Sequence, residues 1–139
     1  MAVADSPAER LHPISVLLVD DDPDMRTMYG RRLMADGFEV RFAADGPEAL
    51  QAANRSLDLV LLDVRMPGMD GLEVLRRLKG DAGMAAVPVV MLSNEREESS
   101  VQRARAIGAA AWWTKCDVVP AELSRRVGYL LSSHHPVIS

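Results

Sequence analysis

The fold class of this chain follows from Leu59-Val60-Leu61-Leu62-Asp63, which runs on into Val64-Arg65-Met66-Pro67-Gly68-Met69-Asp70-Gly71. Four apolar residues in succession, bounded by turn-forming residues, indicate a short strand buried on both faces, as in a parallel sheet. The strand ends on Asp63, and a Pro-Gly and an Asp-Gly turn follow it directly. Because ligands of open parallel α/β sheets bind outside the carboxyl ends of the strands, Asp63 lies where such folds carry their chemistry.

The rest of the chain repeats this pattern of a strand followed by a helix. Strands are predicted over residues 14–19, 38–43, 58–63, 87–92 and 109–113. The second of them alternates polar and apolar residues, which indicates a half-exposed edge strand. Apolar residues at helical spacing follow the strands, and Asp22 and Pro23 suit the cap and first position of the first helix. Five such units predict a three-layer α/β domain, with a parallel sheet and helices on both faces.

Length, charge and cysteine content limit the possible classes of protein. A chain of 139 residues suits one domain, which we place at residues 13–133, between a flexible arm (1–12) and a flexible tail (134–139). The net charge of −4 and the lack of a basic stripe argue against direct nucleic-acid binding. No apolar run is long enough to span a membrane. The single cysteine, Cys116, suits a reducing, cytoplasmic setting.

Polar side chains stand at the carboxyl ends of four predicted strands: Asp20 and Asp21, Asp63, Ser93 and Lys115. Because parallel strands end at the same edge of a sheet, these side chains should share a pocket. Three carboxylates at short range repel one another unless a cation compensates, and an all-oxygen set of this charge suits Mg²⁺. Lysine and serine both suit phosphoryl oxygens. A carboxylate nucleophile, a metal and a lysine together indicate an aspartyl-phosphate site.

Over residues 14–133 the chain resembles the receiver domains of two-component response regulators. The resemblance is carried by Asp20-Asp21 after the first strand, Asp63 in LDVRMPGMDG, Ser93 in VVMLSNE and Lys115 in WWTK. An acidic doublet or an Asp-Gly turn alone is common in proteins. All five residues together, in the order and spacing of the family, are specific for it. The resemblance implies a flavodoxin-like doubly wound sheet with strand order 2-1-3-4-5.

The resemblance also implies the role of each matching residue in the acidic pocket. Asp63 resembles the phosphoacceptor, Asp21 the direct Mg²⁺ ligand, and Asp20 a ligand that acts mainly through water. The backbone carbonyl of Arg65 resembles a further metal ligand. The protein would then be a phosphorylation-dependent switch and not a turnover enzyme. A sensor histidine kinase, a phosphotransfer protein or a small phosphodonor would supply the phosphoryl group to Asp63.

Three further residues match the part of the family that responds to the phosphoryl group. Ser93 resembles the hydroxyl that moves toward it, Lys115 its cationic partner, and Trp112 the aromatic switch residue. An unknown downstream protein is expected to bind the face formed by the fourth helix, fifth strand and fifth helix. Trp112 and Trp113 alternate across a strand, so one is expected in the core and the other exposed.

Alternatives to a phosphorylated switch stay open because the chain departs from the family after Lys115, where Cys116 replaces the usual proline. A pseudo-receiver would use the same fold as a phosphorylation-independent protein-interaction module. A metal-dependent phosphatase would need a second acid two residues after its nucleophile, and Arg65 stands there instead. Flavin binding is disfavoured because acidic residues, and no phosphate-binding loop, follow the first strand.

Arg65 and Glu95 form a possible gate at the mouth of the pocket. Each lies two positions beyond a pocket residue, Asp63 in one case and Ser93 in the other. Their opposite charges would pair and obstruct the water that attacks the aspartyl phosphate. The simpler alternative is that both side chains point into solvent. Simpler alternatives also exist for Ser93 and Asp70, which would serve as helix caps.

Overall fold

The computed structural model describes residues 13–133, so the predicted arm (1–12) and tail (134–139) lie outside the described residues. The strands are β1 (Ser15–Val19), β2 (Glu39–Ala43), β3 (Leu59–Asp63), β4 (Val89–Ser93) and β5 (Ala111–Thr114). The helices are α1 (Pro23–Ala35), α2 (Gly46–Ala52), α3 (Gly71–Gly80), α4 (Glu98–Ile107) and α5 (Pro120–Ser133), with a 3-10 turn, η3 (Lys115–Asp117), after β5.

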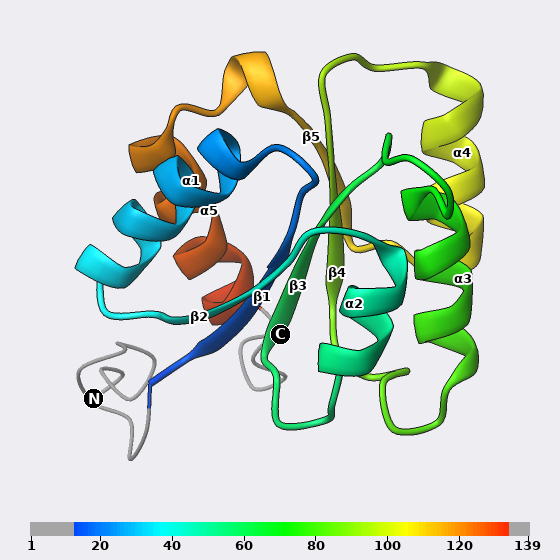
Figure 1. Cartoon of the computed structure of the whole chain (residues 1–139), viewed down its shortest axis with the longest axis horizontal. Helices are drawn as coiled ribbons and strands as arrows, with labels where there is room; N and C mark the ends of the chain where they lie inside the picture. The colour runs from blue at the N-terminus through cyan, green and yellow to red at the C-terminus, as the bar shows by residue number, and fades with distance from the viewer. Residues whose placement is uncertain (1–12, 134–139) are drawn as a thin grey trace.

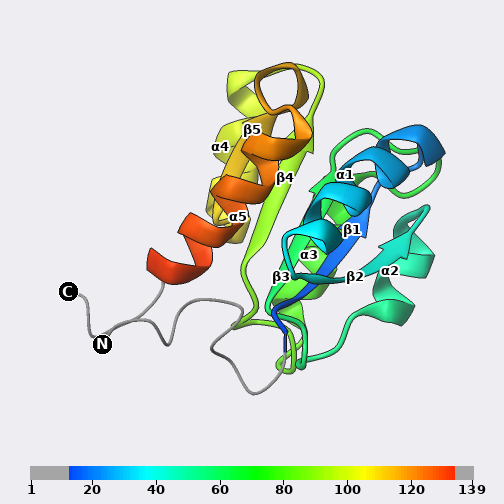
Figure 2. The same ribbon diagram turned by 90° about the vertical axis from the view of Figure 1, so that its left-hand side faces the viewer.

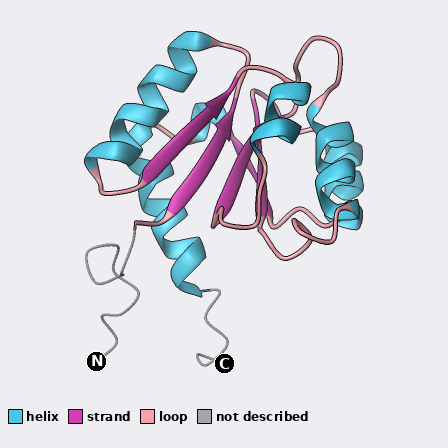
Figure 3. Ribbon diagram, turned by 60° about the horizontal axis from the view of Figure 1, so that its bottom comes forward, coloured by secondary structure: helices cyan, strands magenta, loops and turns pink. Residues whose placement is uncertain are grey.

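The five strands form one parallel sheet in the order β2-β1-β3-β4-β5, which confirms the predicted flavodoxin-like order. Helices cover both faces, with α1 and α5 on one side of the sheet and α2, α3 and α4 on the other (Figure 1; Figure 2). Figure 3 shows the strands between these two layers of helices. The strand β2 is a partly exposed edge strand, as its alternating sequence predicts.

Each face of the sheet has its own apolar core. The strands β1, β3 and β4 contribute to both cores, because successive side chains of a strand point to opposite faces of the sheet. Leu17, Val60 and Leu62 pack with α2 and α3, whereas Leu18, Leu59 and Leu61 pack with α1 and α5. All residues of β1, β3 and β4 are buried, so these apolar runs mark the centre of the sheet.

Strand β4 is shorter than its apolar run suggests. The prediction began at residue 87, but β4 begins at Val89, immediately after Pro88. Proline has no N–H to donate to a sheet, although the Pro88 carbonyl still accepts a hydrogen bond from the Val60 N–H at 3.0 Å. Pro88 therefore marks the boundary of the strand.

Strand β5 corrects the prediction for the two tryptophans. Their side chains do alternate, since Trp112 packs on the α2-α3-α4 side of the sheet and Trp113 on the α1-α5 side. Both are half-buried, so the prediction that one of them is exposed is wrong. Helices cover both faces of this edge strand, and Arg126 lies over the Trp113 ring at 5.6 Å from its centroid.

Two acidic residues near the site are helix caps, as their sequence context predicts. The Asp22 side chain accepts a hydrogen bond from the Asp24 N–H at the start of α1, and Pro23 follows it. The Asp70 side chain caps α3 by accepting from the Glu73 N–H at 3.0 Å. Neither residue belongs to the carboxylate cluster at the end of the sheet.

Candidate functional site

The five predicted site residues gather at one end of the sheet. Asp63 and Ser93 are the last residues of β3 and β4, Asp20 and Asp21 are the first two residues after β1, and Lys115 directly follows β5. The register pairs Asp63 with Leu92 and Ser93 with Thr114, so these strand ends are level with one another. In Figure 1 they meet at the upper end of the molecule, where the chain passes into its connecting loops.

Three carboxylates form a cluster at this end of the sheet. Carboxylate oxygens of Asp20, Asp21 and Asp63 all lie within 4.8 Å of one another. Asp20 and Asp63 are buried, whereas Asp21 is exposed. The cluster is therefore open to solvent on the Asp21 side and closed on the side of the sheet.

Lys115 compensates part of this negative charge. Its Nζ donates to Asp20 Oδ2 at 2.8 Å and lies 3.4 Å from Asp63 Oδ1, and its side chain is only 6% exposed. The described residues contain no cis peptide bond, so the Lys115–Cys116 bond is trans. Lys115 thus reaches the carboxylate cluster even though Cys116, and not the family's usual proline, follows it.

Burial and charge shift the pKa values of this cluster. Burial raises the pKa of Asp63 to about 7, the negative charge of Asp20 adds to this, and Lys115 acts against it. Burial alone would lower the pKa of Lys115, but its hydrogen bonds and charge contacts with Asp20 and Asp63 outweigh burial and raise it. Without a bound cation, the pocket therefore holds Lys115 positive and Asp63 close to its titration midpoint at neutral pH.

Hydrogen bonds to both the backbone and the side chain of Asp20 fix its position. Its Oδ1 accepts from the Asp22 N–H at 3.0 Å, and its N–H donates to the Ala43 carbonyl at 3.1 Å. Its carbonyl accepts from Arg26 Nη1 at 2.6 Å. The sequence did not predict this role for Arg26, because nothing in the pattern of the first helix distinguishes it from other helical arginines. With both carboxylate oxygens engaged, Asp20 suits indirect better than direct contact with a metal.

The start of α3 comes unusually close to Asp63. A Cβ atom at position 71 would collide with the Asp63 carbonyl oxygen, and the Gly71 N–H donates to the Val64 carbonyl at 2.8 Å. Only glycine permits this approach of helix to strand end. The pair Asp70-Gly71 thus has two roles: Asp70 caps α3, and Gly71 leaves the space that α3 needs beside Asp63.

Ser93 is buried and faces the loop after β4. Its Oγ accepts a hydrogen bond from the Glu95 N–H at 3.2 Å. The alternative that Ser93 caps the fourth helix is wrong, because α4 begins later and has Glu97 at its cap position. Ser93 therefore organises the β4–α4 loop directly beside the acidic cluster.

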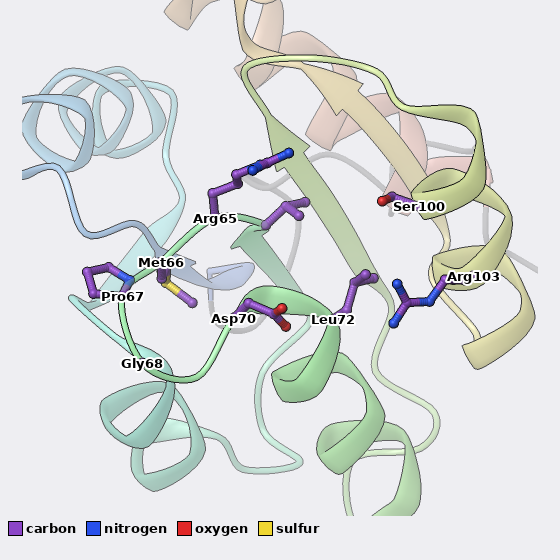
Figure 4. A pocket seen from close by; sticks show the side chains of 9 residues that line it. Arg65, Met66, Pro67, Gly68, Asp70, Leu72, Ser100 and Arg103 are labelled. Carbon is purple, nitrogen blue, oxygen red and sulfur yellow. The ribbon is translucent and has the colours of Figure 1, made fainter.

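Arg65 and Glu95, which each lie two positions beyond a pocket residue, form an exposed ion pair. Arg65 Nη2 lies 3.1 Å from Glu95 Oε2, and the two side chains are 68% and 65% exposed. A hollow of about 560 Å³ lies beside Arg65, between the loop after β3 and α4. Figure 4 shows Arg65 at one end of this hollow and Arg103 extending into it from α4 toward Leu72. The contribution of the Arg65 carbonyl to a metal site stays a prediction.

Trp112 has a polar group without a partner. Among the residues that the structure describes, its Nε1 is the one buried side-chain nitrogen or oxygen with no hydrogen bond. An unpaired buried donor costs about 1–3 kcal/mol, so this indole would gain from a conformation in which the N–H finds an acceptor.

Comparison with known proteins agrees with this arrangement. The family model for the response regulator receiver domain matches residues 16–127. The gliding motility regulatory protein of Myxococcus xanthus is 36% identical over 118 residues, which cover 84% of this chain and 15% of that protein. The DNA-binding response regulator MtrA of Mycolicibacterium smegmatis is 39% identical over 113 residues, covering 81% of this chain and 48% of MtrA. The chain thus spans less than half the length of these two relatives.

Solved structures give the same result at the level of the fold. Chemotaxis protein CheY4 of Vibrio cholerae superposes with a TM-score of 0.77 at 33% identity, covering 84% of this chain and 98% of that one. The BeF3-activated DrrB receiver domain has a TM-score of 0.74 at 25% identity and covers 85% of this chain and 97% of that one. Since the family model spans most of a chain whose strand ends carry this acidic pocket, the chain belongs to the family of response regulator receiver domains.

Proposed function

We propose that this receiver domain is a switch that accepts a phosphoryl group on Asp63 with the help of Mg²⁺. The observation that carries the proposal is the pocket itself, in which carboxylate oxygens of Asp20, Asp21 and Asp63 lie within 4.8 Å. Lys115 reaches Asp20 at 2.8 Å and Asp63 at 3.4 Å in the same pocket. An acidic cluster with one buried cation matches the requirements of phosphoryl transfer to a carboxylate.

The residues present fit Mg²⁺. Three carboxylates against one ammonium leave excess negative charge, and all their donor atoms are oxygens, which Mg²⁺ prefers. Asp21 and Asp63 would hold the ion directly together with the Arg65 carbonyl, and Asp20 would act through water. When bound, the ion neutralises charge on the phosphoryl oxygens. Its retention of several waters suits the open Asp21 side of the cluster.

The protein's own groups would act as follows. An oxygen of the deprotonated Asp63 forms a bond to phosphorus as the bond from phosphorus to the donor's leaving atom breaks, and the leaving group keeps that electron pair. Lys115, which has a raised pKa and so stays charged, binds a phosphoryl oxygen in place of part of its contact with the carboxylates. The Ser93 hydroxyl, whose oxygen accepts from the Glu95 N–H, donates a hydrogen bond to another phosphoryl oxygen.

The partners follow from family membership and remain part of this proposal. A sensor histidine kinase or phosphotransfer protein, or a small phosphodonor, would supply the phosphoryl group in the cytoplasm. The downstream protein would bind the face formed by α4, β5 and α5. The structure has no helix in residues 13–133 that is long and apolar enough to cross a membrane.

Intact-mass measurement after incubation with Mg²⁺ and acetyl phosphate tests the proposal. We expect a gain of one phosphoryl group that is lost in mild base, since acyl phosphates hydrolyse there. No gain with acetyl phosphate, phosphoramidate or a phosphorylated histidine protein would favour the pseudo-receiver, a constitutive interaction module.

Trp112 should report the switch through its fluorescence. Its unpaired indole N–H and its place three residues before Lys115 predict a change of packing when Ser93 and Lys115 engage a phosphoryl group. We expect the emission of a Trp113→Phe variant to change when beryllofluoride and Mg²⁺ are added. The Trp112→Phe variant, which keeps Trp113, is the control. Equal responses in both variants, or none in the first, would contradict the assignment.

The Arg65–Glu95 ion pair should slow dephosphorylation. An exposed pair contributes about 0–1 kcal/mol, so its loss should speed hydrolysis by at most about fivefold. We expect Arg65→Ala and Glu95→Ala each to shorten the lifetime of the phosphorylated protein, and the double variant to add little more. The control is Arg76→Ala, which breaks an exposed helical pair outside the site. Lifetimes equal to the parent's in all three gate variants would exclude a gate.

A further inference from the structure

We propose that Tyr29 is a positioning residue that holds Lys115 in the acidic pocket. The inference rests on the proposed function, because it concerns how the same pocket keeps its cation in place. Tyr29 lies in the middle of α1, where its side chain belongs to the apolar core on the α1-α5 side of the sheet. In the structure it contacts the segment that follows β5 and carries Lys115.

A short chain of contacts joins Tyr29 to Lys115. The Tyr29 hydroxyl donates to the Val118 carbonyl at 2.9 Å. The Val118 N–H in turn donates to the Lys115 carbonyl at 3.1 Å and so closes the turn η3. One end of the Lys115 segment is thus fixed by β5, and the other end by Val118 and the Tyr29 hydroxyl.

Both Tyr29 and Val118 have little freedom to move. Each is 1% exposed, and both belong to the apolar core between the sheet, α1 and α5. A close-packed core of this kind keeps its side chains in one arrangement. Burial raises the pKa of Tyr29, so its hydroxyl stays protonated and remains a donor. Tyr29 therefore ties the segment after β5 to the rigid part of the domain.

The turn η3 itself contributes few anchors. Of its three residues, Cys116 and Asp117 are exposed, and only the Lys115 side chain points into the domain. Lys115 must nevertheless place its Nζ within 2.8 Å of Asp20 and 3.4 Å of Asp63. In a reaction, a shift of about 1 Å in a positioned group can cost about a hundredfold in rate. The Tyr29–Val118 hydrogen bond is well placed to prevent such a shift.

The test compares Tyr29→Phe with Ser124→Ala as a matched control. Each change removes one buried hydroxyl that bonds across the α1-α5 side of the sheet. The Tyr29 hydroxyl joins α1 to Val118, and the Ser124 hydroxyl of α5 donates to Asp36 at the C-terminal end of α1. The Ser124 hydroxyl donates to Asp36, away from the hydrogen bonds that hold the segment of Lys115. Phosphorylation by acetyl phosphate is followed with saturating Mg²⁺, at a temperature where circular dichroism shows both variants folded. We expect Tyr29→Phe to lower the maximal rate by roughly three- to tenfold and Ser124→Ala to leave it unchanged.

A double-variant cycle separates positioning of Lys115 from a general loss of stability. In a Lys115→Met background, Tyr29→Phe should have no further effect on the residual rate, because the group that it positions is gone. A Tyr29→Phe rate equal to the parent's, an equal loss in Ser124→Ala, or the same loss with and without Lys115 would each overturn the proposal. A parent that gains no phosphoryl group would overturn the proposed function as well, so the two failures are distinguishable.

Discussion

The Asp63→Asn variant should gain no phosphoryl group under conditions in which the parent is fully phosphorylated. Asparagine fills the same space at the end of β3, but its amide is not a nucleophile that can form an acyl phosphate. Asp63 is buried beside Lys115, and no other carboxylate shares its place at the end of the central strand. Replacement of this one carboxylate oxygen should therefore abolish phosphoryl uptake, as measured by intact mass.

The matched control is Asp70→Asn, at the end of the loop that follows Asp63. Asp70 is exposed and caps α3 through its side chain, and asparagine caps helices about as well as aspartate. We expect Asp70→Asn to be phosphorylated like the parent. Full uptake by Asp63→Asn would contradict the assignment, as would a peptide map of the parent that places the phosphoryl group elsewhere.

Asp63→Asn should also stabilise the metal-free protein at alkaline pH. The pKa of Asp63 is about 7 in the folded protein, against about 3.9 in an unfolded chain. A raised pKa contributes stability that is fully present below about pH 4 and is lost as the pH rises through about 7. A shift of this size corresponds to an upper limit of about 4 kcal/mol. Thermal unfolding in EDTA should therefore show a higher Tm for Asp63→Asn than for the parent at about pH 8, and a smaller difference near pH 5.

Much of the fold and of the site follows from local sequence. Four consecutive apolar residues before Asp63 predict a central strand, and β3 is central and buried throughout. Asp20, Asp63, Ser93 and Lys115 stand out because each follows or ends an apolar run, and parallel strands bring such ends together. The geometry of a parallel sheet turns these separate sequence positions into one pocket.

What sequence analysis missed depends on contacts between distant segments. The Tyr29 hydroxyl meets the Val118 carbonyl across 89 positions of the chain, and no local pattern marks such a pair. Arg26 likewise resembles any partly exposed helical arginine until the fold brings it to the Asp20 carbonyl. The prediction that one of the two tryptophans is exposed was wrong for the same reason. Alternation gives the direction of each side chain, whereas packing decides its exposure, and Trp113 packs against α5 with Arg126 over its ring.

Asp21→Ala should remove the stabilisation of this domain by Mg²⁺. Asp21 is the exposed member of the carboxylate cluster, so the proposed hydrated ion would enter from its side. An ion present at about ten to a hundred times its Kd stabilises a folded protein by about 1–3 kcal/mol. We expect the parent's Tm to rise with millimolar Mg²⁺ and that of Asp21→Ala to stay nearly constant. The control Asp24→Ala removes the same charge from the first turn of α1, outside the cluster, and should keep the full response.

The same measurement has a pH dependence that follows from Asp63. Below its pKa of about 7, Asp63 carries a proton that must leave before the carboxylate can bind a cation. The stabilisation by Mg²⁺ should therefore be smaller near pH 6 than near pH 8, because protons compete with the ion only at the lower value. Asp63→Asn should abolish this pH dependence, since it removes the group that titrates. An Mg²⁺-induced rise in Tm that is equal at both pH values, or that survives in Asp21→Ala, would mean that the ion binds elsewhere.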